Sequence, residues 1–169
     1  MVRRLVCIAS VLFAALGTGS CASIDLARAV TVTDVLTGWY DWGIKDGMNK
    51  LVPSITFKIT NSGTRPLDGL QVSAAFWIEG DDDGPNDDKQ VQAISTEAIA
   101  PGAATEAITI RSDFGYTYAG ARADMFTNSS FKDVTVRLFA KRGGKIVRIG
   151  EFKLDRRLLP HAAQAPGRQ

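Results

Sequence analysis

Short runs of alternating apolar and polar residues are the feature that most constrains the fold of this chain. Residues 54–60 (SITFKIT) place isoleucine and phenylalanine on one face and threonine and lysine on the other. Residues 70–78 (LQVSAAFWI) repeat the pattern. Because successive side chains of a strand point to opposite faces, such runs predict half-buried β-strands. No long run has the period of an amphipathic helix, so we expect an all-β protein.

Turn residues separate these runs along the chain. NSGTRP (61–66) and APGAAT (100–105) are clusters of turn formers, and Gly143-Gly144 joins two alternating runs as in a hairpin. Residues 121–126 have the composition of one helical turn. We predict one antiparallel, immunoglobulin-like β-sandwich of about seven strands over residues 30–159. The residues after Leu159 (160–169) are expected to be a disordered tail.

The first twenty residues are typical of an export signal. Arg3 and Arg4 precede an apolar core that runs from Leu5 to Leu16, and small residues follow. A membrane-spanning helix needs roughly 20 apolar residues, so this core is too short for a permanent span. We therefore predict that residues 1–20 are a removable signal peptide and that the rest of the chain is exported.

The end of this leader allows three cleavage sites. Cleavage after Ala22 or after Ala29 follows the small-residue rule and discards Cys21. The stretch TGSC (18–21) instead resembles the bacterial lipobox, in which the cysteine is diacylated through its sulfur and becomes the first mature residue. Cys7, inside the leader, is the other cysteine of the chain, so the exported body cannot form an internal disulfide.

We therefore predict cleavage before Cys21, lipidation of Cys21 and a tether over residues 21–29. Ala22 and Ser23, rather than an acidic pair, follow the cysteine. By resemblance to Gram-negative lipoproteins, this implies an outer-membrane lipoprotein that faces the periplasm, with the lipid anchor as its membrane attachment. The alternative is a soluble periplasmic or secreted protein.

Charge and motifs argue against two functional classes. Arg3 and Arg4 account for the net charge of +2, and removing them leaves 18 basic and 18 acidic residues, so the mature chain is a poor nucleic-acid binder. The single histidine, His161, lies in the predicted tail. The chain has no nucleophile elbow, phosphate loop or dinucleotide fingerprint. We expect neither catalysis nor a required cofactor.

Acidic residues gather between the runs at 70–78 and 91–99. Carboxylates on a flexible turn are the hard oxygen ligands that Ca²⁺ prefers, although their spacing differs from that of an EF-hand. The alternative is a solvated loop whose charges keep a sheet edge from pairing with other chains. The candidate metal ligands are Asp81, Asp83, Asp87 and Asp88.

Aromatic residues gather in two segments, GWYDW (38–42) and DFGYTY (113–118), both expected in irregular connections. Aromatics in a small sandwich often cap the core, and Tyr116 fits a tyrosine corner that bonds a backbone group before a strand. Loops also carry binding surfaces, and exposed Trp and Tyr suit sugars or extended peptides. The candidate ligand-binding residues are Trp39, Tyr40, Trp42, Phe114, Tyr116 and Tyr118.

Residues 51–110 resemble the FxLYD-type immunoglobulin-like domains of exported bacterial proteins. These domains share a strand, an Asn-rich turn, a second strand that ends in an aromatic pair, and a Pro-Gly turn into another strand. The resemblance implies a sandwich fold and an extracytoplasmic setting, and it brings no catalytic residues. The matching positions are Phe57, Asn61, Leu67, Val72, Phe76, Trp77, Pro101 and Gly102.

Two functions are compatible with these observations. The first is a non-catalytic envelope lipoprotein that binds a protein partner as an accessory or assembly factor. The second is a soluble periplasmic or secreted module that binds a glycan or peptide through the aromatic segments, with Ca²⁺ in the acidic loop. The sequence indicates neither the partner nor the oligomeric state.

Overall fold

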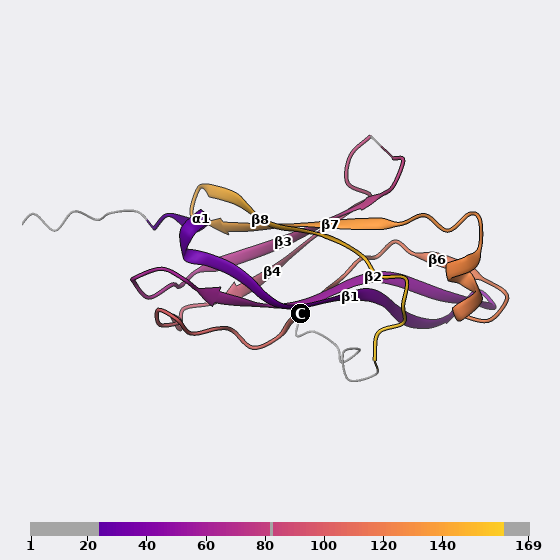
Figure 1. Cartoon of the computed structure of the whole chain (residues 1–169), viewed down its shortest axis with the longest axis horizontal. Helices are drawn as coiled ribbons and strands as arrows, with labels where there is room; N and C mark the ends of the chain where they lie inside the picture. Colours follow the sequence, from indigo (N-terminus) through magenta and orange to yellow (C-terminus); the bar gives the residue numbers. More distant parts are fainter. Residues whose placement is uncertain (1–23, 82, 161–169) are drawn as a thin grey trace, which may run out of the picture.

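The computed structural model describes residues 24–81 and 83–160, which form one all-β domain. Two antiparallel four-stranded sheets pack face to face as a sandwich (Figure 1). The fold class is therefore as predicted, with eight strands in place of about seven. The predictions for the signal peptide, for Cys21, for His161 and for the tail beyond residue 160 fall outside the described residues.

The first sheet is organised around one central strand. Strand β2 (Met48–Asn61) pairs along one side with β1 (Val30–Lys45). Along its other side, β2 pairs with β5 (Ile108–Arg111) and β6 (Tyr116–Tyr118). Because β2 is flanked on both sides, its backbone groups are satisfied within the sheet and its apolar residues form the floor of the core.

The second sheet has the order β4-β3-β7-β8. Its strands are β4 (Asp87–Ile94), β3 (Leu70–Ile78), β7 (Val134–Arg142) and β8 (Lys145–Lys153). Gly143 has a φ of 59° in the turn between β7 and β8. A positive φ is readily adopted by glycine, which confirms the hairpin predicted from the Gly-Gly pair.

The predicted alternation is what fills the space between the sheets. Ile55, Phe57 and Ile59 of β2 are fully buried, as are Val72 and Phe76 of β3. The polar residues between them stay at least partly exposed on the outer faces where the sheet is open to solvent. The physical origin of the sandwich is therefore the period-2 pattern, which gives each sheet one apolar face.

Two short helices lie outside the sheets. The helical turn predicted at residues 121–126 is observed as the 3-10 helix η1 (Ala123–Thr127). The helix α1 (Leu26–Ala29) corrects part of the tether prediction, because its Leu26 side chain is only 2% exposed and belongs to the core. Asp25 caps this helix by accepting a hydrogen bond from the Ala27 amide at 3.2 Å. The ordered domain therefore begins by Ile24 rather than at Val30.

Contacts between the two sheets close both edges of the sandwich. On one side, the segment after β8 crosses to β1: Trp39 donates its amide to the Arg157 carbonyl, and Leu159 donates its amide to the Trp39 carbonyl, at 2.9 and 3.0 Å. On the other side, the Ser112 hydroxyl after β5 donates to the Asp87 carboxylate of β4 at 2.7 Å. The sheets are thus tied by hydrogen bonds as well as by the core.

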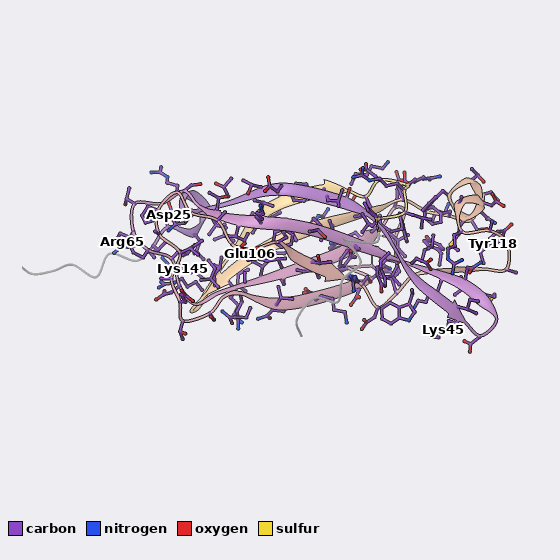
Figure 2. All side chains as sticks on the ribbon, turned by 90° about the horizontal axis from the view of Figure 1, so that it is seen from below. Asp25, Lys45, Arg65, Glu106, Tyr118 and Lys145 are labelled. Atoms are coloured by element: carbon purple, nitrogen blue, oxygen red, sulfur yellow. The ribbon has the colours of Figure 1, made fainter. Side chains whose placement is uncertain are left out.

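The sandwich has two distinct ends. Figure 2 shows Asp25, Arg65 and Lys145 at one end and Lys45 and Tyr118 at the opposite end. Within the described residues, no helix has the length and apolar character needed to cross a membrane.

Candidate functional site

The structure divides the predicted aromatic patch into a buried and an exposed group. Trp39 of β1 is 1% exposed, and its ring centroid lies 4.6 Å from that of Phe131 and 5.7 Å from that of Tyr116. Phe126 of η1 completes the group, 5.4 Å from Phe131 with its ring nearly perpendicular. We call these four residues the buried aromatic cluster. Tilted and edge-to-face rings at such separations are typical of core packing.

The segment around Tyr116 also supports the core. The Tyr116 hydroxyl accepts a hydrogen bond from the Lys132 amide at 3.1 Å, just before β7, which is the role expected of a tyrosine corner. Phe114 and Tyr118 are half-buried and pack against the same core. Of the six predicted ligand-binding aromatics, Trp39 and the three in residues 113–118 therefore have structural contacts that hold this end of the sandwich together.

Tyr40 and Trp42 form the exposed group on the other face of the first sheet. Their ring centroids are 6.1 Å apart in an edge-to-face arrangement, and the Trp42 side chain is 52% exposed. The Arg111 guanidinium of β5 lies 3.9 Å from the Tyr40 ring centroid, and the Lys50 ammonium of β2 lies 5.3 Å from that of Trp42. Cations over aromatic faces at these distances attract the rings and fix their orientation.

Strand alternation places Trp42 on the face opposite the buried Trp39, and a β-bulge lies at this position. The register of β1 and β2 shifts between Asp41 and Gly43, which leaves Trp42 as an extra residue. Asp41 stabilises this bulge, because its carboxylate accepts the Gly43 amide at 2.9 Å and pairs with Arg122 at 2.6 Å. The local backbone therefore holds the indole in place on the sheet surface.

The β1–β2 hairpin beyond the bulge exposes further apolar side chains. Ile44 is 72% exposed and Met48 is 37% exposed. Asp46 and Gly47 form the two-residue turn with φ of 51° and 78°, the positive values of a type I′ hairpin. We define the hairpin patch as Tyr40, Trp42, Met48, Lys50 and Arg111; Ile44, which pairs with Asn49, lies on the opposite face of the hairpin.

Three members of the hairpin patch were not predicted from the sequence: Met48, Lys50 and Arg111. The Asp-Gly pair at 46–47 is the signal that could have found Met48, because it marks a hairpin between two strands. Lys50 and Arg111 come from β2 and β5, and their place beside the two aromatics follows from sheet register alone.

The acidic residues between β3 and β4 do not converge on one point. Asp81 accepts a hydrogen bond from the Asn86 side chain at 2.5 Å within the loop, whereas Asp87 and Asp88 belong to β4, where they pair with Phe76 and Ala75. Asp83 is exposed. Over residues 24–81 and 83–160, no group of three or more His, Cys, Asp or Glu side chains is arranged to hold a metal ion.

Asp87 has a structural partner on the other sheet. Its carboxylate accepts the Ser112 hydroxyl and the Asp113 amide, each at 2.7 Å. Lys89 adds a bond to the Asp113 carboxylate, and that bond raises the pKa of the lysine. These residues therefore connect β4 to the end of β5, a role that was not predicted from the sequence.

The outer face of the second sheet carries a balanced set of charges. A hollow of about 300 Å³ lies beside Trp77, whose ring faces the Arg137 guanidinium at 4.5 Å. Glu151 pairs with Arg137 at 3.0 Å and with Arg148 at 3.1 Å. The basic residues of this hairpin are thus largely compensated there, as in a solvated face.

Comparisons with known proteins assign no family to the chain. No family model matches it, and no curated protein matches it. Among solved structures, it is distantly similar to the structural genomics target SoR45, with 19% identity and a TM-score of 0.39 over 76% of this chain and 88% of that chain. A candidate ApaA protein from Bordetella pertussis gives 18% identity and a TM-score of 0.37 over 76% of this chain and 96% of the other.

Proposed function

We propose that this chain is a non-catalytic envelope lipoprotein that binds a protein partner through the hairpin patch, as an accessory or assembly factor. The observation that carries the proposal is the exposed Trp42 ring, which lies at the bulge beside Tyr40, with the half-buried cations Lys50 and Arg111 against the two rings. A fixed, exposed tryptophan costs hydration free energy that a partner can recover by covering it.

The composition of the patch favours a protein partner. Trp, Tyr and Arg are the residue types enriched at binding hot spots, and Trp42, Tyr40 and Arg111 supply one of each within a few ångströms. Met48 extends the apolar surface towards the hairpin turn, and Ile44 adds exposed apolar surface on the opposite face of the hairpin. Their position at the tip of a protruding hairpin makes them accessible to a large partner.

The position of α1 argues against cleavage after Ala29, one of the two sites that would discard Cys21. Cleavage after Ala29 would remove Leu26, which is 2% exposed in the core, together with the Ala29 carbonyl that accepts the Ser62 amide at 2.9 Å. Losing a buried leucine costs about 2–5 kcal/mol. Cleavage before Cys21 or after Ala22 would keep these contacts, and the lipobox-like residues 18–21 favour Cys21 between the two. The resemblance to FxLYD-type domains also supports an exported setting, and Ala22 and Ser23 after the cysteine favour the periplasmic side of the outer membrane, as in Gram-negative lipoproteins.

The exposed indole also suits a second function, a soluble glycan- or peptide-binding module. A sugar ring can stack on the open face of Trp42, and Lys50 beside it can pair with an acidic group. This version does not require calcium, because Asp87 is engaged with Ser112 and Asp113.

Photocrosslinking in cells tests the first function. A photoreactive residue replaces Trp42, and the matched control replaces Val35, which is 37% exposed and lies on the same strand. We expect a discrete adduct with an envelope protein from position 42 and none from position 35. Trp42→Ala should also abolish co-purification of that protein with the chain. Equal labelling at both positions would contradict the hairpin patch as the binding surface.

Two further measurements separate the remaining alternatives. Intact mass of the membrane-extracted protein should show a chain that starts at Cys21 and carries acyl groups, and Cys21→Ala should remove that added mass. Titration of the protein with glycans should leave Trp fluorescence unchanged if the partner is a protein. A saturable shift that Trp42→Ala removes would instead favour the glycan-binding module.

A further inference from the structure

Three segments meet at the end of the sandwich opposite the hairpin patch. They are α1, the loop after β2 and the turn between β7 and β8, as the positions of Asp25, Arg65 and Lys145 show in Figure 2. Contacts between α1 and β8 join the first and third of these segments. We define the α1 end as residues 24–29, 62–68 and 141–146.

The α1 end lies close to the cysteine that would carry the lipid. Three residue steps separate Cys21 from Ile24, where the described chain begins, so they span at most about 11 Å even when fully extended. The α1 that follows is fixed to the domain by the buried side chains of Leu26 and Ala29. This step rests on the proposed lipidation of Cys21: if it holds, the α1 end is the part of the domain nearest the membrane.

Positive charge is in excess at this end. Arg28 is paired with Asp25 at 3.6 Å and Arg142 with Asp68, and both arginine side chains retain exposed surface. Glu97, in the neighbouring loop whose Ser95 carbonyl accepts the Gly69 amide, reduces the excess but does not cancel it. The basic residues of the α1 end are Arg28, Arg65, Lys141, Arg142 and Lys145, against the acidic residues Asp25 and Asp68.

An exposed apolar side chain lies among these cations. Ile146 is 63% exposed beside Lys145, and its β-sheet partner is Lys141. A hollow of about 390 Å³ on the same end is lined by Ile24, by the paired Asp25 and Arg28, and by Arg65, together with the hydroxyl-bearing Ser62 and Thr64. Lysine and arginine next to an exposed apolar residue match the boundary between phospholipid headgroups and acyl chains.

We propose that the α1 end is a membrane-contact surface that rests on anionic phospholipid headgroups of the same membrane that holds the acyl anchor. Each basic residue near an anionic surface adds attraction, and the anchor keeps the surface within the distance over which this attraction acts. The domain is thereby oriented with the β1–β2 hairpin pointing away from the bilayer. The hairpin patch is then presented to a partner rather than buried against lipid.

An environment-sensitive fluorophore on a single introduced cysteine tests this orientation. Cys7 leaves with the leader and the Cys21 sulfur is in the thioether, so Ile146→Cys or Ile44→Cys supplies the reactive thiol in the acylated full-length product. These positions are matched, since both are highly exposed isoleucines at opposite ends. Each labelled protein is reconstituted into vesicles of phosphatidylcholine, with or without phosphatidylglycerol, and intact mass confirms the acylation of each sample.

We expect a blue-shifted emission and quenching by a lipid-borne quencher at position 146, stronger with phosphatidylglycerol, and neither effect at position 44. Lys141→Gln combined with Lys145→Gln should reduce the shift at 146, as should high salt. Both lysines are exposed, so circular dichroism should show an unchanged fold. Acylated protein with the same emission at both positions would overturn the membrane-contact surface and leave the anchor standing. An unacylated Cys21 would overturn both proposals.

Discussion

Trp39 and Trp42 lie three positions apart on one strand and have opposite roles. Trp39 is 1% exposed and packs at the centre of the buried aromatic cluster, whereas Trp42 is 52% exposed in the hairpin patch. Strand alternation sends the two rings to opposite faces of the sheet, and a bulge lies before Gly43. Aromatics that are adjacent in sequence therefore need not share a site, and substitutions at the two positions should have separable effects.

The largest expected loss of stability comes from removing the Trp39 ring from the buried aromatic cluster. Trp39→Ala should lower the free energy of unfolding by about 3–5 kcal/mol, because it leaves a cavity against Tyr116 and Phe131. Urea denaturation followed by circular dichroism measures this change. Trp39→Phe is the control and should cost less, since the indole N–H has no hydrogen-bond partner within the described residues. A loss below 1 kcal/mol would mean that the two tryptophans are not energetically distinct.

Low pH should weaken the buried aromatic cluster by protonating Asp133, whose partner Arg156 contacts the cluster. Arg156 donates to the Phe126 carbonyl at 2.9 Å and to the Asp133 carboxylate at 2.5 Å. Hydrogen bonds from Lys153 and then Arg156 hold the pKa of Asp133 below its ordinary value of 3.8. A lowered folded-state pKa means that this stabilisation is complete above the unfolded-state value and is lost as the pH falls through the folded-state pKa.

Asp133→Asn tests that linkage. The variant should be less stable than the wild type at neutral pH by about 1–2 kcal/mol, and its stability should fall less steeply between about pH 5 and pH 2. Urea midpoints measured across this range give both quantities. Parallel pH profiles for the two proteins would show that the Asp133 charge does not support the cluster.

A smaller effect is expected from the tyrosine hydroxyl of the same cluster. Tyr116→Phe keeps the ring contacts with Trp39 and Phe131 and removes the acceptor for the Lys132 amide. We expect a loss of about 1 kcal/mol. Amide hydrogen exchange should localise the change to the segment before β7. A protein with wild-type stability and exchange would assign Tyr116 a packing role alone.

The smallest effect on stability should come from replacing Trp42, the exposed tryptophan. Trp42→Ala should change the free energy of unfolding by less than about 0.5 kcal/mol, because the indole is half exposed and fills no cavity. The same variant should lose partner co-purification. A destabilisation as large as that of Trp39→Ala would show that Trp42 is part of the fold rather than of a binding surface.

Side-chain periodicity was enough to predict the sandwich, because every central strand carries its own apolar face. It failed at residues 38–45, where two glycines and the bulge interrupt the alternation, so that part of β1 resembled a loop. It also failed at β6, whose three residues are too short for a periodic pattern to emerge. Strand β4 begins at Asp87 among charged residues, since an edge strand needs apolar side chains on one face only.

The candidate site, too, could be predicted only in part from the sequence. Residue type identified Tyr40 and Trp42 as surface candidates, but it could not distinguish them from Trp39, because burial is decided by which face of the sheet each side chain occupies. Asp87 was assigned to a loop on charge alone, whereas its hydrogen bonds cross to the other sheet. Such long-range pairings depend on the relative placement of strands, which local sequence patterns do not contain.

The crossing segment after β8 has a consequence for the order of folding. The Arg157 guanidinium donates to the Thr37 carbonyl at 3.1 Å across 120 positions of sequence, and Leu159 completes the backbone bridge to Trp39. Synthesis releases β1 first and this segment last, so the earliest large strand stays open along one edge until nearly the whole domain has emerged. Contacts of such high sequence separation slow folding. We therefore expect the bridge that closes this edge of β1 to form only after nearly the whole domain has been synthesised.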